Sequence, residues 1–271
     1  MTVAITHFAA RAGDHTDRAM SGSRLVAAAL AARFDATPSV IGVPSPSTGL
    51  GWELELEAAR GDLIAMQLQY QDVLEAGRSP VTALSRCAVA LATLPVIARH
   101  RPDAVVVWFD AHADINTPDT STSGYLGGLA LSGPLGLWDS GLGDGLAGSA
   151  AVLVGARDID PPEQRLIDAG AVSLIPPSPE LAQRLRRAVA GRPVYFHLDC
   201  DVLEPGIVPT DYLVPDGLSL ETLHAACTVL AESEIVGVEI GELEAEPGHD
   251  HQLVAALFDA LAPVLSAANR S

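Results

Sequence analysis

Short runs of β-branched residues alternate with longer Ala/Leu-rich stretches along the whole chain, and this alternation limits the possible folds more than any other feature. The β-branched runs predict strands at residues 2–7, 39–43, 104–109, 151–155, 172–175, 193–198 and 235–240. Apolar residues at helical spacing predict helices at residues 21–34, 53–76, 86–100, 161–169, 179–190, 219–232 and 250–267. This order is typical of a sheet covered by helices on both faces, so we expect a three-layer α/β/α fold with a mostly parallel central sheet. The length also fits a single domain over residues 1–271.

Charge and cysteine content narrow the kind of partner and environment. The chain has 34 Asp and Glu residues against 16 Lys and Arg, a formal net charge of −18. Nucleic acids and anionic membranes attract positive charge, so we expect neither as a partner and favour a small molecule, for which a cation fits best. The N-terminal region lacks a basic segment followed by an apolar core, which predicts a cytoplasmic protein. Three cysteines, Cys87, Cys200 and Cys227, are too few for a disulfide framework and favour reduced thiols or a metal-binding role.

The stretch VVVWFDAHADIN, residues 105–116, changes abruptly from apolar to ionisable side chains. Asp110, His112 and Asp114 follow the predicted strand 104–109 at every second position. Ligands bind at the carboxyl ends of the strands in parallel sheets, and alternate residues of an extended segment point the same way. We therefore expect the two carboxylates and the imidazole to converge on a cation, although the stretch alone also fits a solvated loop with an incidental histidine. The long segments 43–51 and 117–149 are further candidates for functional loops.

A second predicted strand ends in the same way, because VYFHLDCDVLEP places Asp199 and Asp201 after an apolar run. Carboxylates at the ends of two buried strands repel one another unless a cation neutralises them. Mixed oxygen and nitrogen ligands, mostly carboxylates, suit a pair of hard divalent ions such as manganese, and such pairs activate water. His197 fits a supporting role beside the ligands as well as it fits an ordinary core histidine. Cys200 should point away and be buried, and HDH at residues 249–251 fits the solvated start of a helix.

Together, DAHADIN (110–116) and HLDCDVLEP (197–205) resemble the signatures of the ureohydrolases, the family of arginase and agmatinase, and the likeness extends over residues 80–245. The resemblance implies an arginase-like fold and two Mn²⁺ ions per chain. It implies metal ligands at Asp110, His112, Asp114, Asp199 and Asp201.

The same resemblance implies a substrate-binding set. NTPDTSTSGYLGG (116–128) resembles the loop that holds the substrate α-carboxylate, here through Asn116, Ser121 and Ser123. GARDIDPPE (155–163) resembles the segment that binds the α-amino group, here through Asp160 and Glu163. VEIGELEAE (238–246) resembles the stretch that holds the guanidinium, which gives that role to Glu242.

The chain departs from the family pattern at two places. Ureohydrolases begin a helix with Gly-Gly-Asp-His, whose histidine binds the first metal, whereas this chain has Leu84, Ser85, Arg86 and Cys87. A buried structural cysteine is one interpretation of Cys87, but its register with the missing histidine favours a sixth metal ligand. Gly127 stands where arginases have a histidine that relays protons, so that relay is absent and space should be left at position 127.

These departures define the expected reaction. Agmatine has no α-carboxylate to occupy Asn116 and the two serines, and the changes at Cys87 and Gly127 argue against plain arginine. A ureohydrolase with a cysteine at the position of the histidine ligand resembles the hydroxyarginine-cleaving ureohydrolases of D-cycloserine biosynthesis. We therefore expect cleavage of Nω-hydroxy-L-arginine to hydroxyurea and L-ornithine, with Glu242 and Asp114 as catalytic residues. The alternatives are arginase, another ureohydrolase such as agmatinase or formimidoylglutamase, and an inactive binding relative. A monomer is favoured, because the chain lacks the extended C-terminal tail that joins some arginases into trimers.

Overall fold

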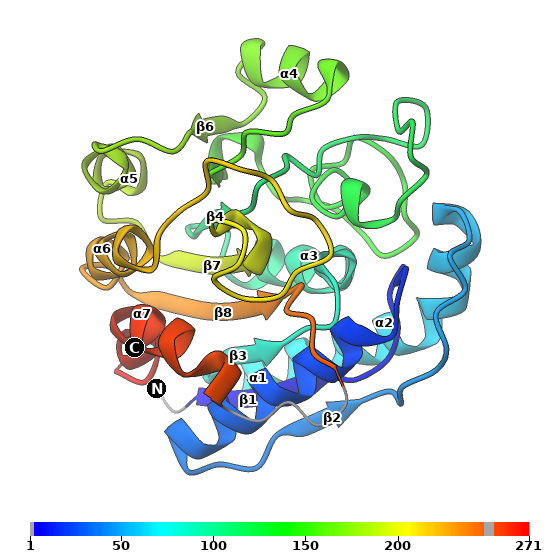
Figure 1. Cartoon of the computed structure of the whole chain (residues 1–271), viewed down its shortest axis with the longest axis horizontal. Coiled ribbons are helices and arrows are strands. Elements are labelled where there is room, and N and C mark those ends of the chain that lie inside the picture. The colour runs from blue at the N-terminus through cyan, green and yellow to red at the C-terminus, as the bar shows by residue number, and fades with distance from the viewer. Residues whose placement is uncertain (1–2, 247–251, 271) are drawn as a thin grey trace.

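The computed structural model describes residues 3–246 and 252–270, and its centre is an eight-stranded sheet in the order β2-β1-β3-β8-β7-β4-β5-β6 (Figure 1). Each pair of neighbouring strands is parallel. The strands are β1 (Val3–Phe8), β2 (Ser39–Ile41), β3 (Ser79–Ala83), β4 (Val105–Phe109), β5 (Ala151–Val154), β6 (Ser173–Ile175), β7 (Val194–Asp199) and β8 (Ile235–Gly241). The helices are α1 (Arg18–Phe34), α2 (Trp52–Glu75), α3 (Ala90–His100), α4 (Pro161–Asp168), α5 (Leu181–Val189), α6 (Leu220–Leu230) and α7 (Gln252–Ala268). The predicted α/β fold with a parallel central sheet is confirmed.

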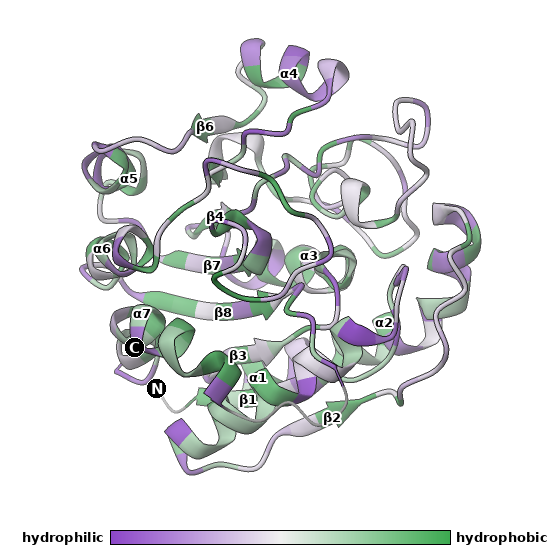
Figure 2. Cartoon of the chain, viewed as in Figure 1, coloured by the Kyte–Doolittle hydropathy of each residue, from purple (hydrophilic) through white to green (hydrophobic). Residues whose placement is uncertain are grey.

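Helices cover both faces of this sheet. Apolar side chains of α1, α5, α6 and α7 form one buried cluster with the strands, and those of α2 and α3 form a second. The central strands β4 and β7 are buried along their whole length, which explains their nearly continuous apolar sequences. In Figure 2 the strands β7 and β8 are mostly green, whereas α4 carries many hydrophilic residues. The three layers expected from the sequence are therefore present.

Strand β3 is the element that the sequence analysis missed. Its residues, SPVTA, are short and small, and Pro80 cannot donate to a sheet ladder, so the segment does not resemble a central strand. The structure nevertheless places it between β1 and β8. Its pairing with β8 begins only at Val81, so Pro80 lies before that ladder starts. The predicted helix start and the HDH segment at 249–251 lie outside the described residues.

Four adjacent strands, β3, β8, β7 and β4, end at the same edge of the sheet. The chain leaves β3 toward Cys87, β8 toward Glu242 and β4 toward Asp110, whereas Asp199 is the last residue of β7. The fold thus brings together residues that are far apart in sequence, as in the hydrogen bond between Cys87 and Glu242, which are separated by 155 positions. Within the described ranges, no helix combines the length and the apolar character needed to cross a bilayer.

Candidate active site and metal centre

A cavity of about 220 Å³ opens at this edge of the sheet. Every residue that the sequence predicted for the site lines it, with the exception of Asp110. Asp110 is fully buried and accepts a hydrogen bond of 2.7 Å from the backbone N–H of His112, so it lies directly behind the lining residues. The predicted residues therefore belong to one site.

The side chains of Asp110, His112 and Asp114, which follow β4, come together for a different reason than we expected. The strand stops at Phe109, and residues 110–116 form a loop rather than an extended segment with alternating side chains. Asp114 has a left-handed backbone, with φ of 54°, which is uncommon for any residue except glycine. Its carbonyl oxygen accepts hydrogen bonds from the N–H groups of Leu131 and Ser132, which hold the loop in place. The three side chains therefore reach one site through the course of this loop and its hydrogen bonds, not through strand periodicity.

The end of β7 repeats this local geometry. The N–H of Asp201 donates to Asp199 Oδ1 at 2.7 Å, as the N–H of His112 does to Asp110. His112 Nδ1 then lies 3.2 Å from Asp110 Oδ1 and 3.1 Å from Asp201 Oδ2. Burial alone would lower the pKa of His112, but the hydrogen bonds to these two carboxylates raise it to about 12. In the chain alone, His112 is thus the cation that partly neutralises the two aspartates.

Three overlapping groups of side chains could each hold a metal ion. Within each group the ligand atoms lie within 4.8 Å of one another, and the groups are Cys87–Asp110–Asp114, Asp110–His112–Asp201 and Cys87–Asp199–Glu242. Burial and the charges of neighbouring carboxylates raise the pKa values of Asp114 and Asp199 well above the usual range. Buried carboxylates that repel one another in this way favour a multivalent cation, so the donor set fits the expected metal pair.

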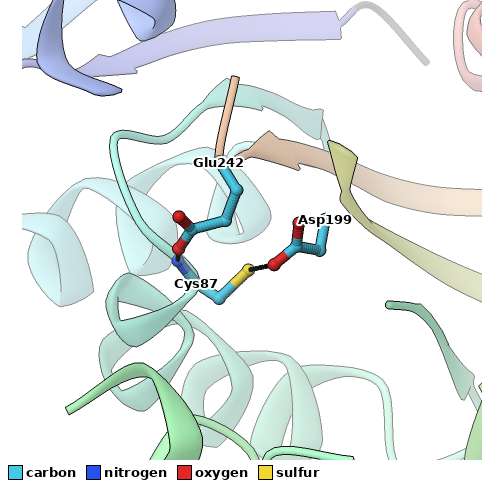
Figure 3. A group of neighbouring side chains, drawn as sticks. All are labelled: Cys87, Asp199 and Glu242. Carbon is cyan, nitrogen blue, oxygen red and sulfur yellow. Dashed lines mark hydrogen bonds between the residues drawn. The ribbon is translucent and has the colours of Figure 1, made fainter. Parts of the chain in front are cut away.

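Cys87 faces this cluster and is 1% exposed. Its sulfur points toward the carboxylate of Asp199, with Sγ and Oδ2 3.2 Å apart (Figure 3). Burial, followed by the charge of Asp199, raises the pKa of the thiol well above its usual range, so the chain alone holds it protonated. A bound metal would replace that proton, as it does at other thiolate ligands.

His197 supports Cys87 from behind. Its Nε2 lies 3.1 Å from Cys87 Sγ and its Nδ1 lies 2.8 Å from Glu239 Oε2. The ring also stacks flat on Trp108, with ring centroids 3.5 Å apart. Because the Glu239 carboxylate accepts from Nδ1–H, Nε2 is left free to accept a proton from the thiol. The supporting role, one of the two alternatives for His197, is therefore the one that the geometry favours. Cys200 is buried in the core, as expected.

Glu242 is held by the protein on both of its oxygens. Oε2 accepts from the Nη1 of Arg86 at 2.7 Å, and Oε1 accepts from the backbone N–H of Cys87 at 2.7 Å. The backbone at Glu242 is left-handed, with φ of 61°. Burial raises the pKa of this carboxyl group to about 7, although Arg86 works against that shift. From the sequence, Arg86 was noted only as a departure from the family motif, and no role was predicted for it. Its one signal was a charged residue inside the apolar segment 81–98.

The residues predicted for substrate binding line the same cavity. Asn116 donates from Nδ2 to Asp160 Oδ2 at 2.9 Å, which links the two predicted segments directly. The side-chain oxygens of Ser121 and Ser123 accept backbone N–H groups of the same loop, so their hydroxyl protons remain available to a ligand. Glu163 accepts from the N–H groups of Ile115 and Asp160 and closes the capping box of α4. Its predicted contact with an amino group stays a prediction.

The space at Gly127 is filled, contrary to our expectation. A Cβ atom added at Gly127 would lie 2.3 Å from Cε1 and 2.9 Å from Cζ of Tyr125. The aromatic ring of Tyr125 therefore covers the position from which a histidine would project. Tyr125 and Tyr212 both line the cavity, with ring centroids 5.9 Å apart, and neither was predicted. The signal available in the sequence was the tyrosine two residues before the altered glycine.

Comparison with known proteins places this site in a family. A sequence model of the arginase family matches residues 54–262. The chain is 42% identical over 260 residues, 95% of each chain, to the Nω-hydroxy-L-arginine amidinohydrolase of Streptomyces lavendulae. It is 28% identical over 211 residues, 70% of each chain, to the arginase of Bacillus caldovelox. The crystal structure of arginase from Bacillus subtilis superimposes with a TM-score of 0.82 at 21% identity, covering 100% of this chain and 99% of that one.

These matches cover most of the chain and define its class. The protein belongs to the arginase family. The resemblance to ureohydrolases drawn from the sequence motifs is thereby confirmed at the level of family and fold.

Proposed function

We propose that this protein is a binuclear manganese hydrolase that cleaves Nω-hydroxy-L-arginine to hydroxyurea and L-ornithine. The observation that carries the proposal is the position of Cys87, whose sulfur lies among the acidic side chains where arginases use a histidine. The relative from Streptomyces lavendulae, which is similar over 95% of this chain, is named for hydroxyarginine. The filled space at Gly127 supports the same conclusion, because the site has no room for the histidine relay of arginases.

The metal-binding part of the proposal assigns six ligands to two Mn²⁺ ions. Cys87, Asp110, Asp114 and Asp199 would hold one ion, and Asp110, His112, Asp199 and Asp201 would hold the other. Carboxylate oxygens and an imidazole suit manganese, and the buried, mutually repelling acids at this edge supply the charge that two divalent ions require. When bound, such a pair supplies an activated water at neutral pH.

The remaining residues bind and orient the amino acid. We assign the α-carboxylate to Asn116, Ser121 and Ser123, and the α-amino group to Asp160 and Glu163. Asn116 and Asp160 already form a hydrogen bond, so both contacts would be set by one rigid unit. The guanidino group would then extend toward Glu242 and Asp114, which line the same cavity.

The reaction consumes one water. Oxygen from water adds to the guanidino carbon, the bond from that carbon to the side-chain nitrogen of ornithine breaks, and that nitrogen takes up a proton. Because position 127 has no side chain to relay the proton, we assign its transfer to the carboxyl group of Asp114. Glu242 would orient the guanidino group. The setting we propose is cytoplasmic D-cycloserine biosynthesis, with the protein acting as a monomer.

The decisive experiment is an assay of ornithine release from arginine and from hydroxyarginine, run side by side on the purified protein with manganese. We expect turnover of hydroxyarginine, slow or absent turnover of arginine, and about two manganese ions per chain by elemental analysis. Faster cleavage of arginine would make the protein an arginase. Absence of bound metal and of turnover with both substrates would make it an inactive relative.

A further inference from the structure

Arg86 is a fully buried guanidinium directly behind the cavity. Its three nitrogens each face a carboxylate: Nη1 is 2.7 Å from Glu242, Nε is 3.1 Å from Asp14 and Nη2 is 3.4 Å from Glu244. Nη1 also lies 3.6 Å from Asp211. The side chain does not line the cavity. A buried charge of this kind is stable only when it is paired, so Arg86 is fixed in place by these acids.

Of these four acids, Glu242 is the one that lines the cavity. A carboxylate forms its strongest contact with a planar guanidinium, and Glu242 already makes that contact with Arg86. Its second oxygen accepts the N–H of Cys87. A substrate guanidinium that enters the cavity therefore meets an acid that already has a guanidinium partner inside the protein.

The effect of the Arg86–Glu242 pair on substrate binding depends on the charge of the substrate. Arginine is always protonated in water, and its cation would lose hydration in the cavity without gaining an unpaired counter-charge from Glu242. An N-hydroxyguanidine is less basic and can enter as a neutral group, which needs hydrogen bonds but no counter-charge. The two substrates differ in size by one oxygen atom and also in charge. Of these two differences, the charge has the larger effect on binding at this site.

We propose that Arg86 is a positioning residue that sets substrate specificity: by pairing with Glu242, it makes the site select a neutral hydroxyguanidine over a cationic guanidinium. This inference rests on the proposed function, since it explains a preference for hydroxyarginine. It assigns the discrimination to a residue that does not touch the substrate.

The first test uses the wild-type protein and no turnover. L-Citrulline is the neutral analogue of arginine with the same length and nearly the same shape. Calorimetric titration of the manganese-loaded protein should show citrulline binding at least as tightly as arginine. Arginine binding about tenfold or more tightly than citrulline would overturn the inference. This test remains valid even if hydroxyarginine is not cleaved, so its failure is distinct from failure of the proposed function.

The second test compares variants by the ratio of kcat/KM for the two substrates. A loss of folded protein or of metal lowers both values equally and leaves this ratio unchanged. In Arg86→Met, the ratio of kcat/KM for arginine to that for hydroxyarginine should rise about tenfold or more, because Glu242 is released. Arg86→Lys keeps the positive charge and should keep the wild-type ratio. Arg101→Met is the matched control, because Arg101 pairs with Glu234 and Asp103 far from the cavity, and it should leave the ratio unchanged.

The pH profile separates this role from a structural one. In the wild type, KM for hydroxyarginine should fall as pH rises, because a larger share of the substrate becomes neutral. Arg86→Met should flatten or reverse that trend. If a folded, metal-loaded Arg86→Met protein keeps both the wild-type ratio and the wild-type KM profile, Arg86 does not set specificity. If this variant does not fold, the citrulline comparison decides alone.

Discussion

The imidazole of His197 lies between Cys87 and Glu239, with Nε2 3.1 Å from the thiol and Nδ1 2.8 Å from the carboxylate. Glu239 is itself fully buried and also accepts the hydroxyl groups of Tyr70 and Tyr195. This carboxylate therefore fixes which nitrogen of His197 carries the proton. Because Cys87 is a proposed metal ligand, the arrangement resembles the carboxylate–histidine pairs that orient ligands from behind a metal.

Replacement of Glu239 by Gln should weaken manganese binding at the first site. The amide can donate to Nδ1 and reverse the tautomer of His197, so that Nε2 can no longer take up the proton that Cys87 would lose when a metal binds. Loss of such supporting contacts lowers metal affinity by roughly 10- to 100-fold. Manganese dissociation constants would be measured by competition with a chelator. Tyr70→Phe, which removes one hydroxyl from Glu239 and leaves His197 in place, should change them much less; equal effects of the two variants would contradict this role.

Cys87→Ser should lower the manganese content from about two ions per chain toward one, because a hydroxyl group is a far weaker ligand than a thiolate. The substitution changes little in volume, so the fold should be kept. Elemental analysis after gel filtration measures the outcome. Cys227→Ser makes the same chemical change at a buried cysteine of α6, away from the cavity, and serves as the control. Full manganese content in Cys87→Ser would show that the cysteine is a packing residue.

Gly127→His should destabilise the protein without creating a proton relay. The new Cβ would lie 2.3 Å from the ring of Tyr125, and overpacking of this kind costs about 1–3 kcal/mol. Thermal unfolding would show the loss, and the double variant Tyr125→Ala/Gly127→His should recover most of it. Gly128→Ala is the matched control, because no atom lies within 4 Å of the added Cβ. A single Gly127→His variant as stable as the wild type would mean that Tyr125 moves aside freely.

The metal-free protein should lose stability as pH rises from about 4.5 to about 7. Burial raises the pKa of Glu163 from 4.5 to about 7, so in this range the folded chain holds a proton that the unfolded chain has released. The pKa of Asp14 is also raised, first by burial, and acts in the same direction. His7, whose pKa is lowered to about 4 by burial, acts in the opposite direction but is a single group.

The measurement is the melting temperature of chelator-treated protein across this pH range. Glu163→Gln, which cannot titrate, should reduce the slope relative to the wild type. A melting temperature that rises from pH 5 to pH 7 would contradict the assignment.

The sequence was sufficient to predict the parallel sheet because its central strands are buried on both faces and appear as unbroken apolar runs. It failed for β3, where Pro80 and small residues conceal a strand whose place is set by its neighbours rather than by its own composition. The acidic side chains of the site could be predicted because they directly follow apolar runs. A position at the end of a strand can be recognised from the neighbouring residues alone. Arg86 and Tyr125 could not be assigned in this way. Their roles depend on Glu242 and Gly127, through contacts that only the folded chain creates.

The position of β8 has a consequence for how the chain is made. It is the last strand in the sequence of the described residues, yet it lies in the middle of the sheet, between β3 and β7. During synthesis on the ribosome, β1, β2 and β3 emerge on one side of this gap, and β4, β5, β6 and β7 follow on the other. The two half-sheets can join only after residues 235–241 have left the exit tunnel. A nascent chain therefore holds Cys87 and Asp199 apart until translation of the described residues is nearly finished.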